Sequence, residues 1–176
     1  MQENDTRRPS ELWKRLSGER RAQAAEAFWR DENALIEQAE VMGAIARRIK
    51  FRLKSVQAMP IENKVRHLLA VPAVSEAVIA RLLVSYHLAH QRAMMGTFLD
   101  AVGIAHEDGL ITEDALTSPP ADRLKAAAAA LRASYPAEDV SLYLSTLHWQ
   151  DPETWAGLSD LPEVRQQPAA APPQRA

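Results

Sequence analysis

Apolar residues recur every three or four positions over residues 19–49, a long stretch near the N-terminus. They are separated by charged residues and comprise Ala24, Ala27, Phe28, Leu35, Ile36, Ala39, Met42, Ile45, Ala46 and Ile49. This spacing places them along one side of an α-helix. A break is expected near residues 31–33, because Asp and Asn favour helix caps. The chain has no run of alternating β-branched residues, so we predict an all-α fold, a compact bundle of about six to eight helices.

The longest predicted helix covers residues 75–103, with Ser75 as its N-cap. Apolar side chains surround this helix on all sides except for a thin polar strip. That strip is made by Arg81, Ser85, Arg92 and Asp100. A helix that is apolar on every side belongs in the middle of a bundle, so we expect residues 75–103 to form a buried central rod.

Prolines and a glycine divide the rest of the chain into shorter predicted helices. They cover residues 9–17, 61–71, 119–135, 137–150 and 152–161. The tryptophans near their ends are expected to anchor packing. Residues 162–176 are rich in Pro and Ala and lack a periodic apolar face. We therefore predict one all-α domain over residues 1–161 and a disordered tail over residues 162–176.

Composition excludes several classes of site. The chain has no cysteine, so disulfides, thiolate zinc sites and cysteine nucleophiles cannot occur. The N-terminal residues are charged and contain no apolar core of a secretory signal. The longest apolar run, residues 77–84, is interrupted by Arg81, whereas a membrane-spanning helix needs about 20 apolar residues. We expect a cytoplasmic protein with no transmembrane segment.

The polar segment AHEDGLITEDAL, residues 105–116, resembles the second half of an EF-hand calcium loop around its glycine. The ligands do not fit, because Ile104 and His106 would fall at the first and third ligand positions and Ala115 at the position of the bidentate Glu. Asp108 and Gly109 instead form a turn dipeptide. Thr112 is expected to cap a short helix that follows the turn.

Histidines offer the main candidates for chemistry. His87 and His90 lie three residues apart on the predicted central helix, and His106 follows near its end. These three side chains are the candidate metal ligands, although a straight helix would separate His90 from His106 by about 24 Å. The favoured interpretation is a buried polar network, since buried polar groups require partners. That network would contain Tyr86, His87, His90, Gln91 and Arg92. No catalytic motif is present, and no cofactor is expected.

A basic stretch, RRIKFRLK, stands out in a chain with a formal net charge of −2. Its candidate binding residues are Arg47, Arg48, Lys50, Phe51, Arg52 and Lys54. They could contact nucleic acid or an anionic membrane, with Phe51 stacking or inserting. Cations also suit the C-terminal end of a helix without any partner, and the chain as a whole is not basic. Nucleic-acid binding is therefore the less favoured interpretation.

These patterns favour a non-catalytic helical protein that binds a protein partner or itself, as a possible homodimer paired through the apolar side of residues 19–49. A metal-binding or enzymatic bundle that uses His87 and His90 is the first alternative. Anion or nucleic-acid binding through residues 47–54 is the second.

Overall fold

The computed structural model describes residues 8–165, and the all-α prediction is confirmed there. This part of the chain contains nine α-helices, two 3₁₀-helices and one short hairpin. The α-helices are α1 (Pro9–Arg15), α2 (Gly18–Arg30), α3 (Leu35–Ile49), α4 (Leu53–Gln57), α5 (Ile61–Leu69), α6 (Glu76–His90), α7 (Arg92–Val102), α8 (Ala121–Ser134) and α9 (Ala137–Gln150). The 3₁₀-helices are η1 (Glu32–Ala34) and η2 (Ala156–Asp160), and the strands are β1 (His106–Glu107) and β2 (Leu110–Ile111).

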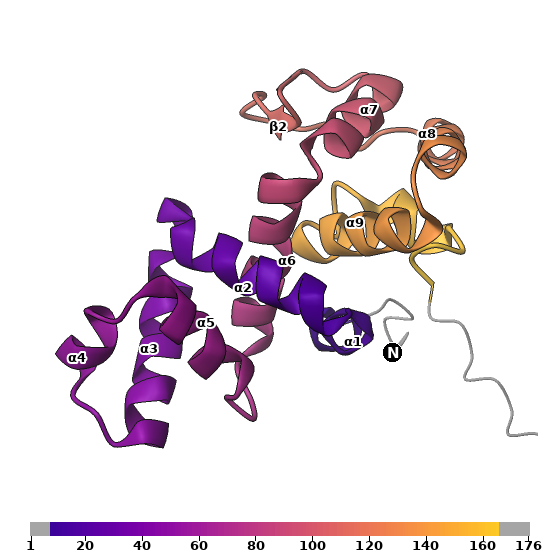
Figure 1. The fold of residues 1–176 in the computed structure, drawn as a ribbon. Helices are drawn as coiled ribbons and strands as arrows, with labels where there is room; N and C mark the ends of the chain where they lie inside the picture. Colours follow the sequence, from indigo (N-terminus) through magenta and orange to yellow (C-terminus); the bar gives the residue numbers. More distant parts are fainter. Residues whose placement is uncertain (1–7, 166–176) are drawn as a thin grey trace, which may run out of the picture.

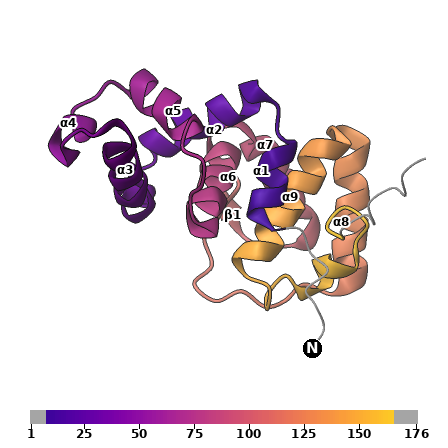
Figure 2. The same cartoon turned by 90° about the horizontal axis from the view of Figure 1, so that it is seen from below.

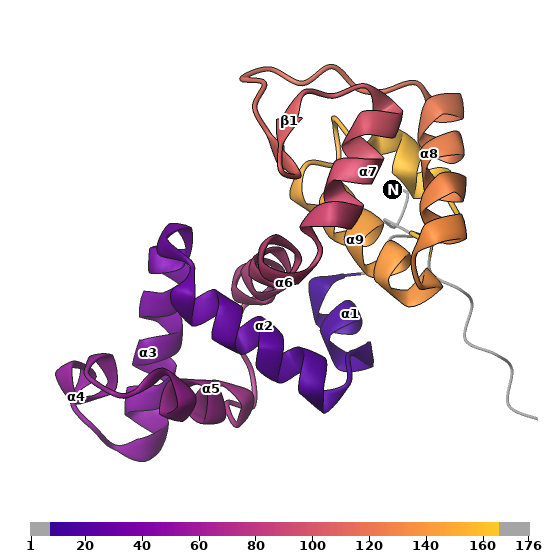
Figure 3. The ribbon, with the colours of Figure 1, turned by 45° about the horizontal axis from the view of Figure 1, so that its top comes forward.

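Helix α6 lies in the middle of the molecule (Figure 1). Helices α3 to α5 gather on one side of it and α7 to α9 lie on the other, while α2 packs across α6 and α1 lies beside both α6 and α9 (Figures 2 and 3). Leu82 of α6 belongs to an apolar cluster with α2, α3 and α5, and Leu83 belongs to a second cluster with α1 and α9. A third cluster, built from α7, α8, α9 and η2, lies beyond the end of α6. The prediction of a buried helix at the centre is confirmed for α6.

The prediction of one continuous helix over residues 75–103 is wrong, because the helix is interrupted at Gln91. Ser75 caps α6 by accepting a hydrogen bond from the Val78 backbone N–H at 3.3 Å. The backbone dihedral angles of Gln91, φ −127° and ψ 19°, are not helical, so the axis of α7 has a different direction from that of α6. Tertiary packing explains the break, since α7 then buries Phe98 and Leu99 in the cluster that it shares with α8 and α9.

Residues 19–49 form two α-helices joined by the 3₁₀-helix η1, and the predicted break near residues 31–33 is confirmed. Asp31 ends α2, and its carboxylate accepts a hydrogen bond from the Asn33 N–H at 2.9 Å. Most of the predicted apolar side faces inward: Ala24, Phe28 and Ile45 are fully buried within the chain's own core, and Met42, Ala46 and Ile49 pack against it. That part of the surface is therefore not free to pair with a second copy.

The segment from residue 105 to residue 120 differs from its prediction. His106 pairs with Ile111 and Glu107 with Leu110 in an antiparallel hairpin. The predicted turn is confirmed, with positive φ at Asp108 and Gly109. The helix expected after Thr112 is absent, since no helix is present between β2 and α8.

The chain beyond α9 continues the fold for longer than predicted. Residues 152–161, predicted as a helix, form turns followed by the shorter η2. Trp155 and Val164 are buried in the cluster with α8 and α9, so residues 162–165 belong to the folded part of the chain. Residues 166–176 of the predicted tail lie outside the described residues. Within residues 8–165, none of the helices has both the length and the apolar composition needed to cross a bilayer.

Candidate functional site

The three candidate metal ligands lie in different environments. His87 is buried on α6 and faces α9, and His90 is exposed at the end of α6. His106 lies on β1, beside α7. Over residues 8–165, no three His, Asp or Glu side chains are grouped so that they could hold a metal ion. The described structure therefore gives no support to a metal centre.

His106 fastens the hairpin to α7. Its Nδ1 accepts a hydrogen bond from the Gly109 backbone N–H at 3.1 Å. The neutral ring therefore carries its proton on Nε2, which donates to the Asp100 carboxylate at 3.1 Å. Both ring nitrogens have protein partners, so His106 has a structural role: it attaches the hairpin to α7.

The predicted polar network divides into separate local contacts. His87 bonds to Thr146 of α9, and the Tyr86 ring lies against both His87 and His90, with centroids 5.7 Å and 5.3 Å apart. The Arg92 guanidinium donates to the Leu88 carbonyl at 2.7 Å and pairs with the Asp108 carboxylate at 3.4 Å. Among the described residues, no hydrogen bond joins the side chains of Tyr86, His87, His90 and Arg92 to one another, and His87 is the member with a distinctive environment.

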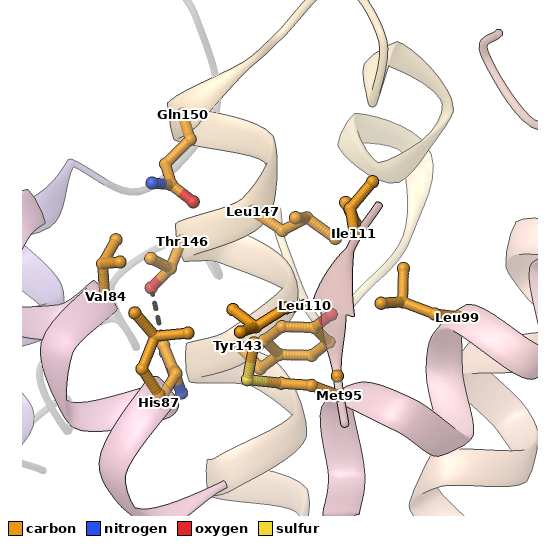
Figure 4. Close-up of a pocket in the computed structure, with 12 residues that line it drawn as sticks. Val84, His87, Met95, Leu99, Leu110, Ile111, Tyr143, Thr146, Leu147 and Gln150 are labelled. Atoms are coloured by element: carbon orange, nitrogen blue, oxygen red, sulfur yellow. Dashed lines mark hydrogen bonds between the residues drawn. The ribbon is translucent and has the colours of Figure 1, made fainter. Parts of the chain in front are cut away.

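A pocket of about 160 Å³ lies beside His87, between α6, α7, β2 and α9 (Figure 4). The residues that line it are mostly apolar, and none is Asp, Glu, Lys or Arg. They are Val84, His87, Leu88, Met95, Leu99, Gly109, Leu110, Ile111, Tyr143, Thr146, Leu147 and Gln150. The hairpin supplies three of them, so its attachment to α7 by His106 also holds one wall of the pocket in place.

The hydrogen bonds fix the tautomer of His87. The Thr146 hydroxyl uses its only hydrogen to donate to the Leu142 carbonyl at 2.7 Å. The contact of 3.3 Å between His87 Nε2 and Thr146 Oγ1 is then a donation from Nε2–H to the hydroxyl oxygen. Nδ1 consequently carries a free lone pair, and this buried atom has no partner within the described residues.

Burial lowers the pKa of His87 to about 3 by desolvation of the charged imidazolium. The ring is therefore neutral at physiological pH and is a much weaker base than an ordinary histidine. It can accept a hydrogen bond through Nδ1, but it is poorly suited to general-base catalysis. The surroundings of His87 fit binding better than proton transfer.

The predicted basic patch lies at the end of α3, in the following loop and in α4. All six predicted residues are exposed, and Lys50 caps α3 in the left-handed conformation at φ 56°. None of the five cations forms an ion pair with any residue in the part of the chain that the structure describes. We call residues 47–54 the cationic tip. Phe51 and Leu53 within it are 56% and 53% exposed.

Two features of these sites differ from what the sequence predicts or could not be predicted from it. The pocket combines His87 with residues of the hairpin and α9 that are distant along the chain, and no local pattern could indicate that meeting. Leu35 and Ile36 were assigned to the buried side of a helix, yet they are 67% and 84% exposed on α3. The chain changes direction at η1, between α2 and α3, and this places Leu35 and Ile36 on the outer side of α3.

Comparisons with protein-family models, with curated proteins and with solved structures found no match for this chain.

Proposed function

We propose that this chain is a non-catalytic helical interaction protein, and that a protein partner docks along the outer side of α3 as far as the cationic tip. The proposal is based on one observation, the exposure of large apolar side chains. Among the described residues seven large apolar side chains are exposed, and four of them lie on α3 and the segment that follows it. These four are Leu35, Ile36, Phe51 and Leu53.

The outer side of α3 has a shape that suits a second helix. At 100° per residue, Ile36, Ala39, Gly43 and Arg47 point in nearly the same direction. The small side chains of Ala39 and Gly43 separate the large apolar end of α3 from its basic end. A partner helix that packs over Gly43 must displace the Arg47 guanidinium, which lies 3.4 Å from where a Cβ atom of residue 43 would be. Fifteen residues of helix span about 22 Å. We call this strip, with Leu35 beside it, the α3 face.

The charges of the cationic tip indicate the chemistry of the partner. Its five cations form no ion pair within residues 8–165, and they belong to a chain with a formal net charge of −2, so positive charge is concentrated at this place. Complementary charge accelerates and orients association. We therefore propose a partner with an amphipathic helix, apolar where it meets Leu35 and Ile36 and acidic where it meets residues 47–54. The cytoplasmic location and the homodimer remain predictions.

A photo-crosslinking residue at Ile36 or at Phe51 tests the proposal in cells, with the same residue at exposed Lys14 of α1 as the control. We expect the first two positions to trap the same protein and the control not to trap it. That protein is then purified and its affinity measured against the triple variant R47Q/R48Q/R52Q. We expect binding at least about tenfold weaker, a change of 1.4 kcal/mol.

The matched control K14Q/R15Q/K125Q removes three exposed cations from other helices and should leave the affinity unchanged. Equal weakening by both triple variants would contradict docking at the cationic tip. Crosslinks from Ile36 and Phe51 to nucleic acid or lipid in place of protein would contradict the proposed class of partner. A crosslinked second copy would identify the chain itself as the partner.

A further inference from the structure

We propose that a groove along α6 binds a free α-amino acid with a large apolar side chain. The zwitterionic head of this ligand is held between Arg81 and Glu37, and its side chain enters the pocket beside His87. The site is separate from the docking surface on α3, because Glu37 lies on the side of α3 that faces α6.

The groove consists of two adjoining pockets. The first is the pocket of about 160 Å³ beside His87, which we call the apolar pocket. The second, of about 220 Å³, lies between α3, α6 and the end of α9, and we call it the charged pocket because Glu37 and Arg81 line it. Val84 and Gln150 line both pockets. The two spaces therefore meet at this pair of side chains, which Figure 4 shows at one end of the apolar pocket.

One face of α6 forms the floor of both pockets. It carries Ala77, Arg81, Val84 and Leu88, which lie on the same side of the helix at 100° per residue. All four are at least partly exposed, so the described residues leave this face of α6 incompletely covered. Arg81 and Leu88 are seven residues apart, which is about 10 Å along the helix. The groove thus runs from a charged end at Arg81 to an apolar end at Leu88.

Arg81 and Glu37 lie near each other without a hydrogen bond. The distance between Arg81 Nε and Glu37 Oε1 is 3.9 Å, which is beyond hydrogen-bonding range. Neither side chain forms a hydrogen bond to another residue in the range 8–165. The two side chains are only 29% and 20% exposed, so their contact with solvent is restricted. Both charged groups can therefore gain hydrogen bonds from a ligand.

A zwitterion matches this pair of charges better than a single charge does. Its carboxylate accepts hydrogen bonds from the Arg81 guanidinium, and its ammonium group donates to the Glu37 carboxylate. An anion alone would be repelled by Glu37, and a cation alone would be repelled by Arg81. An α-amino acid carries the two required groups on one carbon atom.

The apolar pocket specifies the side chain of the ligand. Its volume of about 160 Å³ is close to that of an engineered apolar cavity of about 150 Å³ that binds benzene, so one phenyl ring fits. Leu88, Met95 and Leu147 line it, and none of its lining residues is Asp, Glu, Lys or Arg. Transfer of an apolar ring from water to this lining is favourable. Phenylalanine is therefore the probe.

Calorimetry on the full chain compares L-phenylalanine with three related molecules. One is 3-phenylpropionate, which lacks the ammonium group, and another is phenethylamine, which lacks the carboxylate. The third is L-alanine, which keeps the zwitterionic head but has no side chain that reaches the apolar pocket. We expect one phenylalanine per chain, and binding at least about tenfold weaker for each of the other three, since each loses a charge-assisted hydrogen bond or the apolar contact.

Two variants separate the charges of the site. Glu37→Gln should weaken phenylalanine but strengthen 3-phenylpropionate, because the repulsion of its carboxylate is removed. Arg81→Gln should likewise weaken phenylalanine and strengthen phenethylamine. The matched control is Glu26→Gln, which changes another Glu–Arg ion pair, on α2, and should leave every dissociation constant unchanged. Damage to the fold would instead weaken all the ligands together.

If a variant fails to fold, the wild-type chain decides through the indole N–H resonance of Trp149, which lines the charged pocket. Phenylalanine must shift this resonance, and 3-phenylpropionate at the same concentration must shift it less. The proposal is overturned if phenylalanine does not bind the wild-type chain or leaves the Trp149 resonance in place. It is also overturned if 3-phenylpropionate or phenethylamine binds as tightly as phenylalanine, or if the two variants weaken all the ligands alike.

Discussion

The neutral state of His87 depends on its neighbours in α6 and α9. The ring is only 3% exposed, and its single N–H is used by Thr146. A protonated ring would carry a second N–H on Nδ1, and no acceptor for it lies within the described residues. Burial and hydrogen bonding thus act in the same direction, and both favour the neutral form.

This neutrality predicts how stability depends on pH. The pKa of His87 is about 3 in the folded chain against an ordinary value of 6.5, so between these values only the unfolded state binds the proton. The free energy of unfolding should therefore fall as pH falls, by about 1.4 kcal/mol per pH unit from this group. Urea unfolding of the wild type and of His87→Leu between pH 7 and pH 4 measures the difference. Parallel curves for the two proteins would show that His87 titrates normally.

The Thr146 side chain is expected to contribute more to the free energy of unfolding than that of its buried neighbour Ser145. Thr146→Val removes the acceptor of His87 Nε2–H and the donor to Leu142. This change should lower the free energy of unfolding by about 1–3 kcal/mol, because buried polar groups lose their partners. Ser145→Ala is the control on the same helix, since the buried Ser145 hydroxyl has no hydrogen-bond partner among residues 8–165. Chemical denaturation compares the two; equal losses would mean that the Thr146 bonds contribute nothing specific.

At the scale of elements, the hairpin depends on a close approach to α7. Gly109 lies at φ +81°, and a Cβ atom there would meet the Arg92 carbonyl oxygen at 2.8 Å. Gly96 on α7 faces His106 in return, with a Cβ distance of 3.3 Å to the ring. Two glycines therefore let the hairpin lie on the helix and form a wall of the pocket.

Gly109→Ala should weaken this contact, because it adds both backbone strain and a steric clash. The expected loss is about 1–3 kcal/mol, with faster hydrogen exchange at the Leu110 and Ile111 amides. Gly18→Ala is the matched control, since a Cβ atom at Gly18 has no neighbour within 4 Å. Unchanged exchange in the hairpin of Gly109→Ala would show that α7 and the hairpin accommodate the methyl group.

At the scale of the whole molecule, α6 is shared by both groups of helices. Its residues Leu82 and Leu83 are buried in different clusters, and Leu88 packs against the third. A loss of packing at α6 should therefore destabilise the helices on both sides of it. This arrangement favours cooperative unfolding of the two groups.

Leu83→Ala should lower the free energy of unfolding by about 2–5 kcal/mol, as expected for a cavity in a core. Hydrogen exchange should accelerate by the same factor in the most protected amides of α3 and of α8. Leu53→Ala, at an exposed position, should change stability by less than about 0.5 kcal/mol. Acceleration confined to one side of α6 would show that the two groups of helices unfold separately.

The helical class, the break at Asp31, the Ser75 cap and the turn at Gly109 could all be predicted from the amino-acid sequence. Each of these depends on local chemistry: the spacing of apolar residues, a carboxylate or hydroxyl that caps a helix, and a glycine with positive φ. The sequence also indicated the exposed cationic tip, because five cations within eight residues cannot be buried together.

The break at Gln91, the outward position of Leu35 and Ile36, and the environment of His87 depend on the packing of the folded chain. Gln91 has no strong local signal to end a helix, so the packing of α7 against α8 sets the direction of the chain. His87 meets Thr146 across 59 residues of sequence, and its protonation state depends on that meeting. The residues that bury His87 and bond to it are distant along the chain. The periodicity of the sequence relates only residues on the same helix, so it could not reveal them.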